Sequence, residues 1–255
     1  TYTPNDMSCV CTTLVTDMSS LFENKATFND DISNWDTSNV TNMFELFRDA
    51  RAFNQDLSTW DTSNVRNMSK MFDRARNFNN GGNPSMFSNV SSVTTMFAMF
   101  WDARNFNRDI GSWDVSNVVN MGEMFKGAQK FTNGDSNSIN NWDVSDVASM
   151  NQMFRGASKF DQPLNNWDVR KVENMGSMFY GAVEFNQPLN GWVTDTLKVI
   201  NNMFREAVKF NQPLSNWDIS DVRRLANVFL NATAFNQNLG DWNVGNVTTM
   251  SNMFR

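Results

Sequence analysis

The sequence predicts an α/β repeat fold, a solenoid in which every coil of about 25 residues contributes one short parallel strand and one short helix. The first observation is a Phe that recurs along the whole chain at intervals of 25, 25, 28, 25, 29, 25, 25 and 25 residues. A fixed period of about 20–50 residues is typical of solenoids and arrays. The other two observations are a strand period and a helix period that follow one another within each interval. The recurring residues are Phe28, Phe53, Phe78, Phe106, Phe131, Phe160, Phe185, Phe210 and Phe235.

The repeat assigns the chain to one domain, although 255 residues would suffice for two. Residues 1–14 match the repeat poorly and are expected to form an N-terminal cap or a partial coil. Residues 15–255 are expected to form a single solenoid of about nine repeats, the last of which stops within a repeat at Arg255. Cysteine occurs only at Cys9 and Cys11, a spacing that suits a mutual disulfide poorly. They are either small residues of a terminal segment or partners for a segment that precedes this one.

A short strand is predicted where apolar and polar residues alternate. Trp167, Asp168 and Val169 form such a run, which recurs at 113–115 and 217–219. Alternate side chains of a strand face opposite sides, so the Trp and the β-branched residue are expected to face a core. Successive coils run in the same direction, so these strands are predicted to stack in parallel.

A short helix is predicted after each strand. Val172, Met175, Phe179 and Ala182 are spaced i, i+3, i+7 and i+10, which is the period of one helical face. In several coils a Ser lies two residues before this run and is expected to cap the helix. Gly176 weakens the first turn, which predicts a helix that is short or partly 3₁₀.

A surface bend is predicted between the recurring Phe and the following Leu or Ile. Both irregular intervals have their extra polar residues there, at 79–84 and 132–138, and surface loops tolerate such insertions. Pro163 lies in the same segment of another coil, and a Pro argues against a central strand because it has no amide donor. In the first irregular coil the Trp position is either vacant or filled by Phe87.

Composition argues against several classes of function. Lys and Arg total 21 and Asp and Glu total 27, whereas nucleic-acid-binding domains are usually basic. The sequence contains no run of about 20 apolar residues to span a bilayer. It also contains no His, the most frequent general base, and no phosphate-binding Gly loop. We therefore expect no enzymatic activity, no catalytic residues and no bound cofactor.

In a solenoid each repeat position becomes a row of side chains along the axis. The Trp and Met rows are expected to be buried, because Ile200, Leu225 and Val228 replace Met and a metal or redox site would not accept these residues. The Asn that follows the recurring Phe, as at Asn29 and Asn54, is expected to satisfy backbone groups of the bend. These rows are therefore interpreted as structural.

The residue after the Trp is an Asp in six coils, and this row has two interpretations. Carboxylates about 5 Å apart repel one another, so another interaction must offset the repulsion. Bonds from backbone donors of the following turn are the simpler interpretation. A calcium column is the alternative, because calcium takes several oxygen ligands, although no known calcium-binding spacing is present. The row consists of Asp36, Asp61, Asp114, Asp143, Asp168 and Asp218.

The residue after the Phe of the helical run is the best candidate for a partner-binding surface. This row is rich in cations and aromatic rings, and Arg, Trp and Tyr are enriched at the centres of protein interfaces. A polyanionic glycan or an acidic protein would suit such a row, whereas a solvated helix face is the alternative. The candidate residues are Arg48, Trp101, Lys126, Arg155, Tyr180 and Arg205.

The repeated motifs resemble a known surface-protein repeat. Phe-Asn-Gln-Pro-Leu at 185–189 and 210–214, and Trp-Asp-Thr-Ser-Asn-Val at 35–40 and 60–65, are similar to the 25/26-residue repeat of BspA-type leucine-rich-repeat surface proteins. That repeat has also been carried as a domain of unknown function from mycoplasma lipoproteins. The resemblance extends over about residues 15–255 and implies a leucine-rich-repeat-like solenoid, a location on or outside the cell, a role in adhesion and no shared enzymatic activity.

Together these observations predict a non-catalytic extracellular or cell-surface protein that mediates adhesion or the recognition of a protein or glycan. The alternative is a structural subunit of a surface layer, appendage or filament, assembled by self-association through the ends of the solenoid. An incomplete coil motivates this alternative, because it leaves apolar surface and unpaired backbone at an end. Neither hypothesis involves nucleic acid or a membrane span in this segment.

Overall fold

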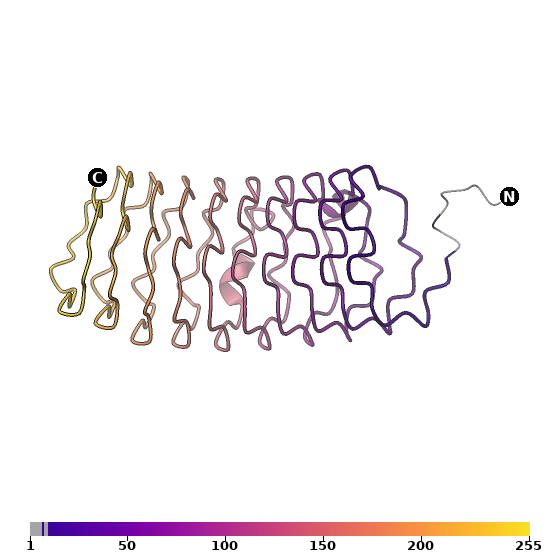
Figure 1. The fold of residues 1–255 in the computed structure, drawn as a ribbon, viewed down its shortest axis with the longest axis horizontal. Coiled ribbons are helices and arrows are strands. Elements are labelled where there is room, and N and C mark those ends of the chain that lie inside the picture. Colours follow the sequence, from indigo (N-terminus) through magenta and orange to yellow (C-terminus); the bar gives the residue numbers. More distant parts are fainter. Residues whose placement is uncertain (1–6, 8–9) are drawn as a thin grey trace.

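The computed structural model describes Met7 and residues 10–255. The chain winds repeatedly about one long axis, so that its repeat units form a stack with the ends of the described chain at opposite ends (Figure 1). Residues that are equivalent by the repeat are neighbours in space. Asn42, for example, pairs with both Asp17 and Asn67 through single-residue parallel β-bridges. The repeat predicted from the Phe spacing is therefore confirmed.

Part of the expected N-terminal cap lies outside the described residues. Cys9 belongs to that part, so the predicted relation between Cys9 and Cys11 lies outside the described residues. Cys11 itself is exposed.

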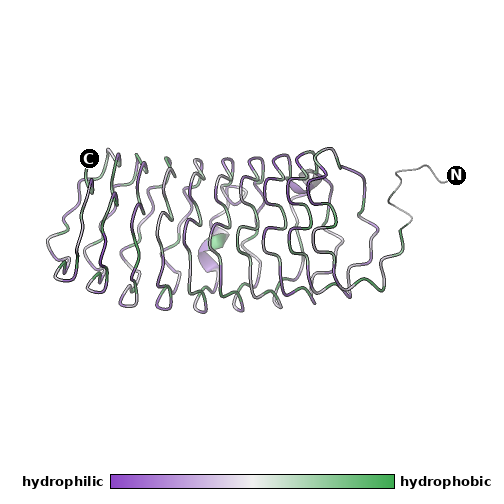
Figure 2. Cartoon of the chain, viewed as in Figure 1, coloured by the Kyte–Doolittle hydropathy of each residue, from purple (hydrophilic) through white to green (hydrophobic). Residues whose placement is uncertain are grey.

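Rings of Phe and Trp form the core of the stack. Within one unit Phe47 and Phe53 stack with 3.9 Å between ring centroids, and Phe47 stacks on Phe72 of the next unit at 5.5 Å. Such pairs contribute about 0.5–1.5 kcal/mol beyond the burial of their area. The Trp row is buried throughout, and the Met row, including Ile200 where it replaces a Met, is buried except at Met250 in the last unit. The assignment of these rows to the core is therefore confirmed for all units but the last. Hydrophobic and hydrophilic residues accordingly alternate in short runs along each unit (Figure 2).

Phe87 fills the Trp position of the first irregular unit. Its side chain is buried, and its ring stacks on Trp113 of the next unit with 6.1 Å between centroids. Of the two sequence interpretations of this position, the filled one is confirmed.

The predicted helix is wrong, because the described residues contain no α-helix. In its place the run from Met43 to Ala50 is a series of turns. Leu46 N donates to Met43 O at 3.3 Å, and the amides of Arg48 and Ala50 likewise donate to the carbonyl three residues earlier. Turns of this kind bring residues three and four positions apart to one side, so they produce the apolar spacing that we interpreted as helical.

Left-handed backbone at every fourth residue prevents the helix. Glu45 and Asp49 have φ of 56°, and the equivalent residues of other units also have positive φ. Their amides face the next unit, where Glu45 N donates to Ser69 O at 3.1 Å and Asp49 N donates to Asp73 O at 2.8 Å. Amides that a helix would satisfy internally are thus satisfied by the neighbouring unit. A left-handed conformation costs about 1–2 kcal/mol for a residue other than Gly, so the bonds between units must offset that cost.

The predicted strand is also wrong, because the described residues contain no β-strand and pair only through one-residue bridges. In this segment the backbone bonds are local: Trp60 N donates to Leu57 O at 3.1 Å, and Val65 N donates to Thr62 O at 3.0 Å. No backbone bond joins these segments of adjacent units within the described chain. The α/β leucine-rich-repeat-like solenoid, with a strand and a helix in every coil, is therefore replaced by a stack of turns.

Side chains join the units where the backbone does not. Trp192 Nε1 donates to Leu164 O of the preceding unit at 2.9 Å, and equivalent indole bonds recur along the Trp row. Thr37 Oγ1 donates to Asp61 O of the following unit at 2.9 Å. Buried carbonyl groups need such donors, so the Trp row serves both packing and hydrogen bonding.

The Asn row satisfies the bends as predicted, with Asn54 Oδ1 accepting a bond from Asn79 N at 2.7 Å. Each irregular unit contains a 3₁₀ helix: η2 (Asn80–Gly82) lies within the first insertion, and η3 (Asn137–Asn141) begins at the end of the second. Most residues of these insertions lie at the surface, but each insertion buries one Asn, Asn80 in the first and Asn133 in the second. Asn80 Oδ1 accepts a bond from Leu57 N at 2.9 Å, and Asn133 Oδ1 accepts the equivalent bond from Ile110 N at 2.9 Å. Each insertion is thus anchored to the neighbouring unit.

Candidate functional site

The candidate partner-binding residues lie in a single row along the stack. Each follows the Phe of the turn series, and its carbonyl accepts a bond from the preceding unit, as in Gly156 N to Tyr180 O at 2.7 Å. These bonds hold successive members of the row at the spacing of the units. We call this set the corner row: Glu23, Arg48, Asp73, Trp101, Lys126, Arg155, Tyr180, Arg205, Leu230 and Arg255. The structure therefore brings all six predicted candidates together.

Cations lie over aromatic rings in the middle of the corner row. Lys126 Nζ is 4.4 Å from the centroid of the Trp101 ring. The guanidinium carbons of Arg155 and Arg205, in the units before and after, lie 4.7 and 4.8 Å from the centroid of the Tyr180 ring. Each cation–π contact contributes about 0.5–1 kcal/mol at an exposed site. The rings therefore hold the flexible cationic side chains in fixed, half-buried positions.

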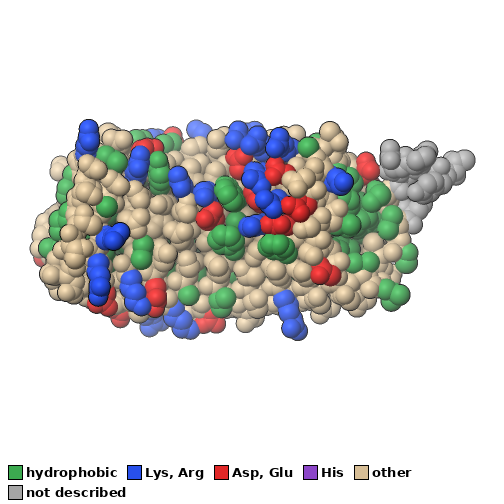
Figure 3. Space-filling view, viewed as in Figure 1, with side chains coloured by type: hydrophobic (Ala, Val, Ile, Leu, Met, Phe, Trp, Pro, Cys, Tyr) green, Lys and Arg blue, Asp and Glu red, His purple; other side chains and the backbone are tan. Residues whose placement is uncertain are grey.

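Ion pairs dominate the N-terminal part of the same row. Arg48 contacts Glu23 at 2.8 Å, Glu45 at 3.2 Å and Asp73 at 3.4 Å. Lys70 also pairs with Glu45, at 3.0 Å. Figure 3 shows charged side chains of both signs gathered near the middle of one face, on the side of the N-terminal units. In this part of the row the basic charges are largely balanced by carboxylates.

Asp73 is the most deeply buried charged residue of the corner row, with a side chain that is 2% exposed. Burial raises the pKa of its carboxyl group to about 6, although Arg74 and Arg48 attract the charged form. Its Oδ2 lies 3.4 Å from Arg48 Nε, whereas its buried Oδ1 accepts no hydrogen bond from the described residues. Asp73 follows Phe72 at the position of the six candidates, but it was not among them because its burial is not visible in the sequence.

The six Asp residues after the Trp form the backbone bonds of the simpler interpretation. Asp114 Oδ1, for example, accepts a bond from Ser116 N at 3.1 Å and from Ser116 Oγ at 2.7 Å. The hydroxyl of Ser116, and then its amide, hold the pKa of Asp114 below its ordinary value. The same bond to the residue two positions later recurs at all six. Among the described residues no group of three or more acidic, His or Cys side chains is placed to hold a metal ion.

A second polar site, which was not predicted from the sequence, is a groove between the eighth and ninth units. It is lined by Lys198, Arg223 and Arg224 together with Asp221 and amide side chains. The sequence feature that could have indicated this groove is the pair Val199 and Arg224, which replace the small polar residue found at the β-bridge position of the other units.

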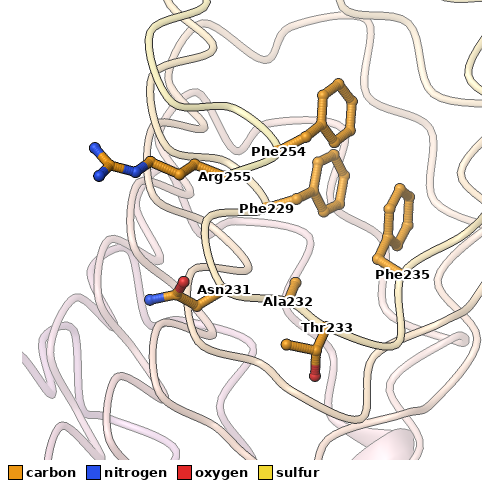
Figure 4. A pocket seen from close by; sticks show the side chains of 7 residues that line it. All are labelled: Phe229, Asn231, Ala232, Thr233, Phe235, Phe254 and Arg255. Atoms are coloured by element: carbon orange, nitrogen blue, oxygen red, sulfur yellow. The ribbon is translucent and has the colours of Figure 1, made fainter.

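A hollow of about 320 Å³ lies at the C-terminal end of the stack. Figure 4 shows the ring of Phe254 beside that of Phe229, with Phe235 across the hollow and the side chain of Arg255 directed away. The Phe254 side chain is 65% exposed, and its ring stacks on Phe229 with 5.7 Å between centroids. This surface is apolar at its centre and polar at its rim.

One protein family matches nearly the whole chain, over residues 2–87, 86–138, 132–207 and 189–255. It is described as Mycoplasma protein of unknown function, DUF285. No curated protein matches the chain. The described residues include no helix that is long and apolar enough to cross a membrane.

Proposed function

We propose that this chain, which belongs to the Mycoplasma DUF285 repeat family, is a non-catalytic recognition protein that acts outside the cell or on its surface. Its partner in this proposal is a protein or glycan with acidic groups, bound at the corner row without a cofactor. The resemblance of the repeats to BspA-type surface proteins supports this location and role. The observation that carries the proposal is the run of half-buried cations and aromatic rings in five consecutive units of the corner row, from Trp101 to Arg205.

The segment from Arg155 to Arg205 is the centre of the proposed surface. Arg155 Nη1 is held by the neutral side chain of Gln152 at 2.7 Å, so its charge remains available to an acidic partner. Arg205 Nε lies 3.3 Å from Glu206 Oε1, and an exposed ion pair of this kind contributes little to stability. Tyr180 between them keeps both guanidinium groups in place. Side chains that are already ordered lose little entropy on binding, which favours contact at this point.

The proposal is tested with fluorescently labelled chain applied to arrays of sulfated, carboxylated and neutral glycans and to immobilised acidic proteins. The triple variant Arg155→Ala/Tyr180→Ala/Arg205→Ala is expected to bind the captured partner at least about tenfold more weakly, because interface centres of this composition carry most of the binding energy. Arg170→Ala is the matched control, since Arg170 is exposed, pairs with Asp168 and lies outside the row. Unchanged binding by the triple variant, or equal loss in the control, would refute the assignment.

A structural role through the ends of the stack is the second candidate function. In this role the apolar hollow lined by Phe229, Phe235 and Phe254 would pack against a second copy. Light scattering across concentration distinguishes the two functions. Concentration-dependent growth that Phe254→Glu abolishes would favour assembly, and growth lost on chelation would indicate that calcium takes part. A chelator-insensitive monomer would refute the assembly role.

A further inference from the structure

A groove of about 630 Å³ opens on the surface between the eighth and ninth units. Its volume falls within the range of about 300–1,000 Å³ that is typical of small-molecule sites. Three cationic side chains, one carboxylate and two amides line it: Lys198, Arg223, Arg224, Asp221, Asn201 and Asn246. This combination of charge and neutral hydrogen-bonding groups distinguishes the groove from the hollow at the C-terminal end.

The groove lies where the backbone ladder of the stack is interrupted. At the preceding junction Lys198 N donates to Glu173 O at 2.9 Å, and Met175 N donates to Val199 O at 2.9 Å. The equivalent bonds form at every other junction within the described chain. Between the eighth and ninth units neither bond forms, and the β-bridge that would join Val199 to Arg224 is absent. The amides of Ile200 and Arg223 therefore lack the bonds that their equivalents form with a neighbouring unit elsewhere.

The sequence explains why this junction opens. In other units the bridge residue is a small polar residue whose side chain accepts a bond from the amide two positions later, as Asn174 Oδ1 does from Gly176 N at 2.9 Å. Val199 has no acceptor atom, and Arg224 has only donors, so neither side chain can close this local turn. The two replacements occur in consecutive units, so the junction between them loses both local turns.

We propose that this groove binds a sugar that carries a carboxylate or sulfate group. Arg223 and Arg224 form no ion pair with the described residues, and Lys198 is oriented toward the preceding unit by Glu173 at 2.8 Å. The two guanidinium groups, together with the amide of Arg223, which forms no backbone bond, suit the oxygens of an anion. Asp221, Asn201 and Asn246 supply acceptors and donors for the hydroxyl groups of the sugar. The site does not depend on the corner row, so it extends the proposed function without relying on it.

The binding of glucuronic acid, glucose 6-sulfate, glucose and acetate to the purified chain is measured by calorimetry. Both acidic sugars are expected to bind, with glucose and acetate each at least about tenfold weaker. The double variant Arg223→Gln/Arg224→Gln is expected to reduce binding of the acidic sugars by at least about tenfold. Equal binding of acetate and glucuronic acid, or of glucose and glucuronic acid, would overturn the assignment, as would no binding of either acidic sugar.

Two further variants separate the shape of the groove from its charge. Val199→Asn restores a polar acceptor for Asn201 N without changing the charge, and it is expected to weaken binding by narrowing the gap. Arg66→Gln is the matched control, because Arg66 occupies the position of Arg223 at a junction whose ladder is intact, with Thr94 N bonded to Arg66 O at 2.9 Å. Unchanged binding in Val199→Asn, or a loss in Arg66→Gln as large as in the double variant, would contradict the proposal. Thermal melts confirm that each variant is folded.

Discussion

Two alanines in one unit offer a direct test of the left-handed turn positions. Ala98 has φ of 53°, whereas Ala103 does not have a positive φ, and both side chains are fully buried. Ala98 N donates to Gly122 O of the next unit at 2.9 Å, a bond that a Gly at position 98 would retain. Replacing either residue with Gly removes one methyl group, so the two variants differ chiefly in the backbone conformation that the Gly must adopt.

The expected free energies of unfolding follow from three contributions. The lost methyl group costs about 0.8 kcal/mol in either variant. The greater freedom of Gly in the unfolded chain costs about 0.5–1 kcal/mol more. At Ala98 these losses are offset by relief of about 1–2 kcal/mol, the cost of holding an L-residue in the left-handed region. Ala103→Gly should therefore be destabilised by about 1.5 kcal/mol, and Ala98→Gly should remain within about 0.8 kcal/mol of the wild-type chain.

Equilibrium unfolding in urea, followed by Trp fluorescence, measures this difference. Linear arrays can lose two-state behaviour, but both substitutions lie in the same unit, so any partial unfolding affects them alike. Midpoints are compared at unchanged slope. Equal destabilisation of the two variants would refute the turn structure, because two positions in a regular helix would respond to Gly in the same way.

Three further predictions concern buried or capped polar groups. Folding raises the pKa of Asp73 from 3.8 to about 6, so between these pH values the native state binds more protons than the unfolded chain. The stability of the wild-type chain relative to Asp73→Asn should therefore fall as the pH rises from 4 to 7. Urea unfolding midpoints of both proteins at the two pH values test this. Trp192→Phe should lower the free energy of unfolding by about 1–3 kcal/mol, because Leu164 O loses its buried donor; an undiminished urea midpoint would contradict this. Asp114→Ala should cost about 0.5–1.5 kcal/mol, whereas Asp114→Asn should be nearly neutral, since Asn243 makes the same bond at 3.1 Å. A rise in melting temperature on adding calcium that Asp114→Asn abolishes would contradict this reading of the Asp row.

The buried rows were predictable because their chemistry repeats with the period. A Trp or Met that recurs every 25 residues and is replaced only by apolar residues has few places to lie except a core. The Asp and Asn rows were predictable for a similar reason, since short polar side chains beside a bend satisfy local amides. Asp114 and Asn54 accept the bonds expected of them.

The secondary structure was not predictable from the same patterns. The spacing of Met43, Phe47 and Ala50 suits a helical face and a series of three-residue turns equally well. What separates the two is the sign of φ at Glu45, and Glu is common in helices, so composition favoured the wrong alternative. The bond from Glu45 N to Ser69 O, which stabilises the left-handed turn, exists only once the next unit is in place.

The groove was not predicted because the sequence indicates it only through two residues that depart from the repeat. Val199 and Arg224 are ordinary residues individually, and only the expectation of a small polar acceptor at their position makes them significant. That expectation depends on the turn structure. The corner row, by contrast, was identified from composition, although the ion pairs of Arg48 and the burial of Asp73 emerged only from the structure.

Amide hydrogen exchange, resolved by residue, tests the ladder of bonds between units most directly. Met175 N donates across an intact junction, whereas Ile200 N forms no backbone bond across the open one. Slow exchange at Met175 with rapid exchange at Ile200 is the predicted result. Equal protection at the two amides would contradict the open junction and remove the basis of the groove. Rapid exchange at Met175 would contradict the stack of turns itself.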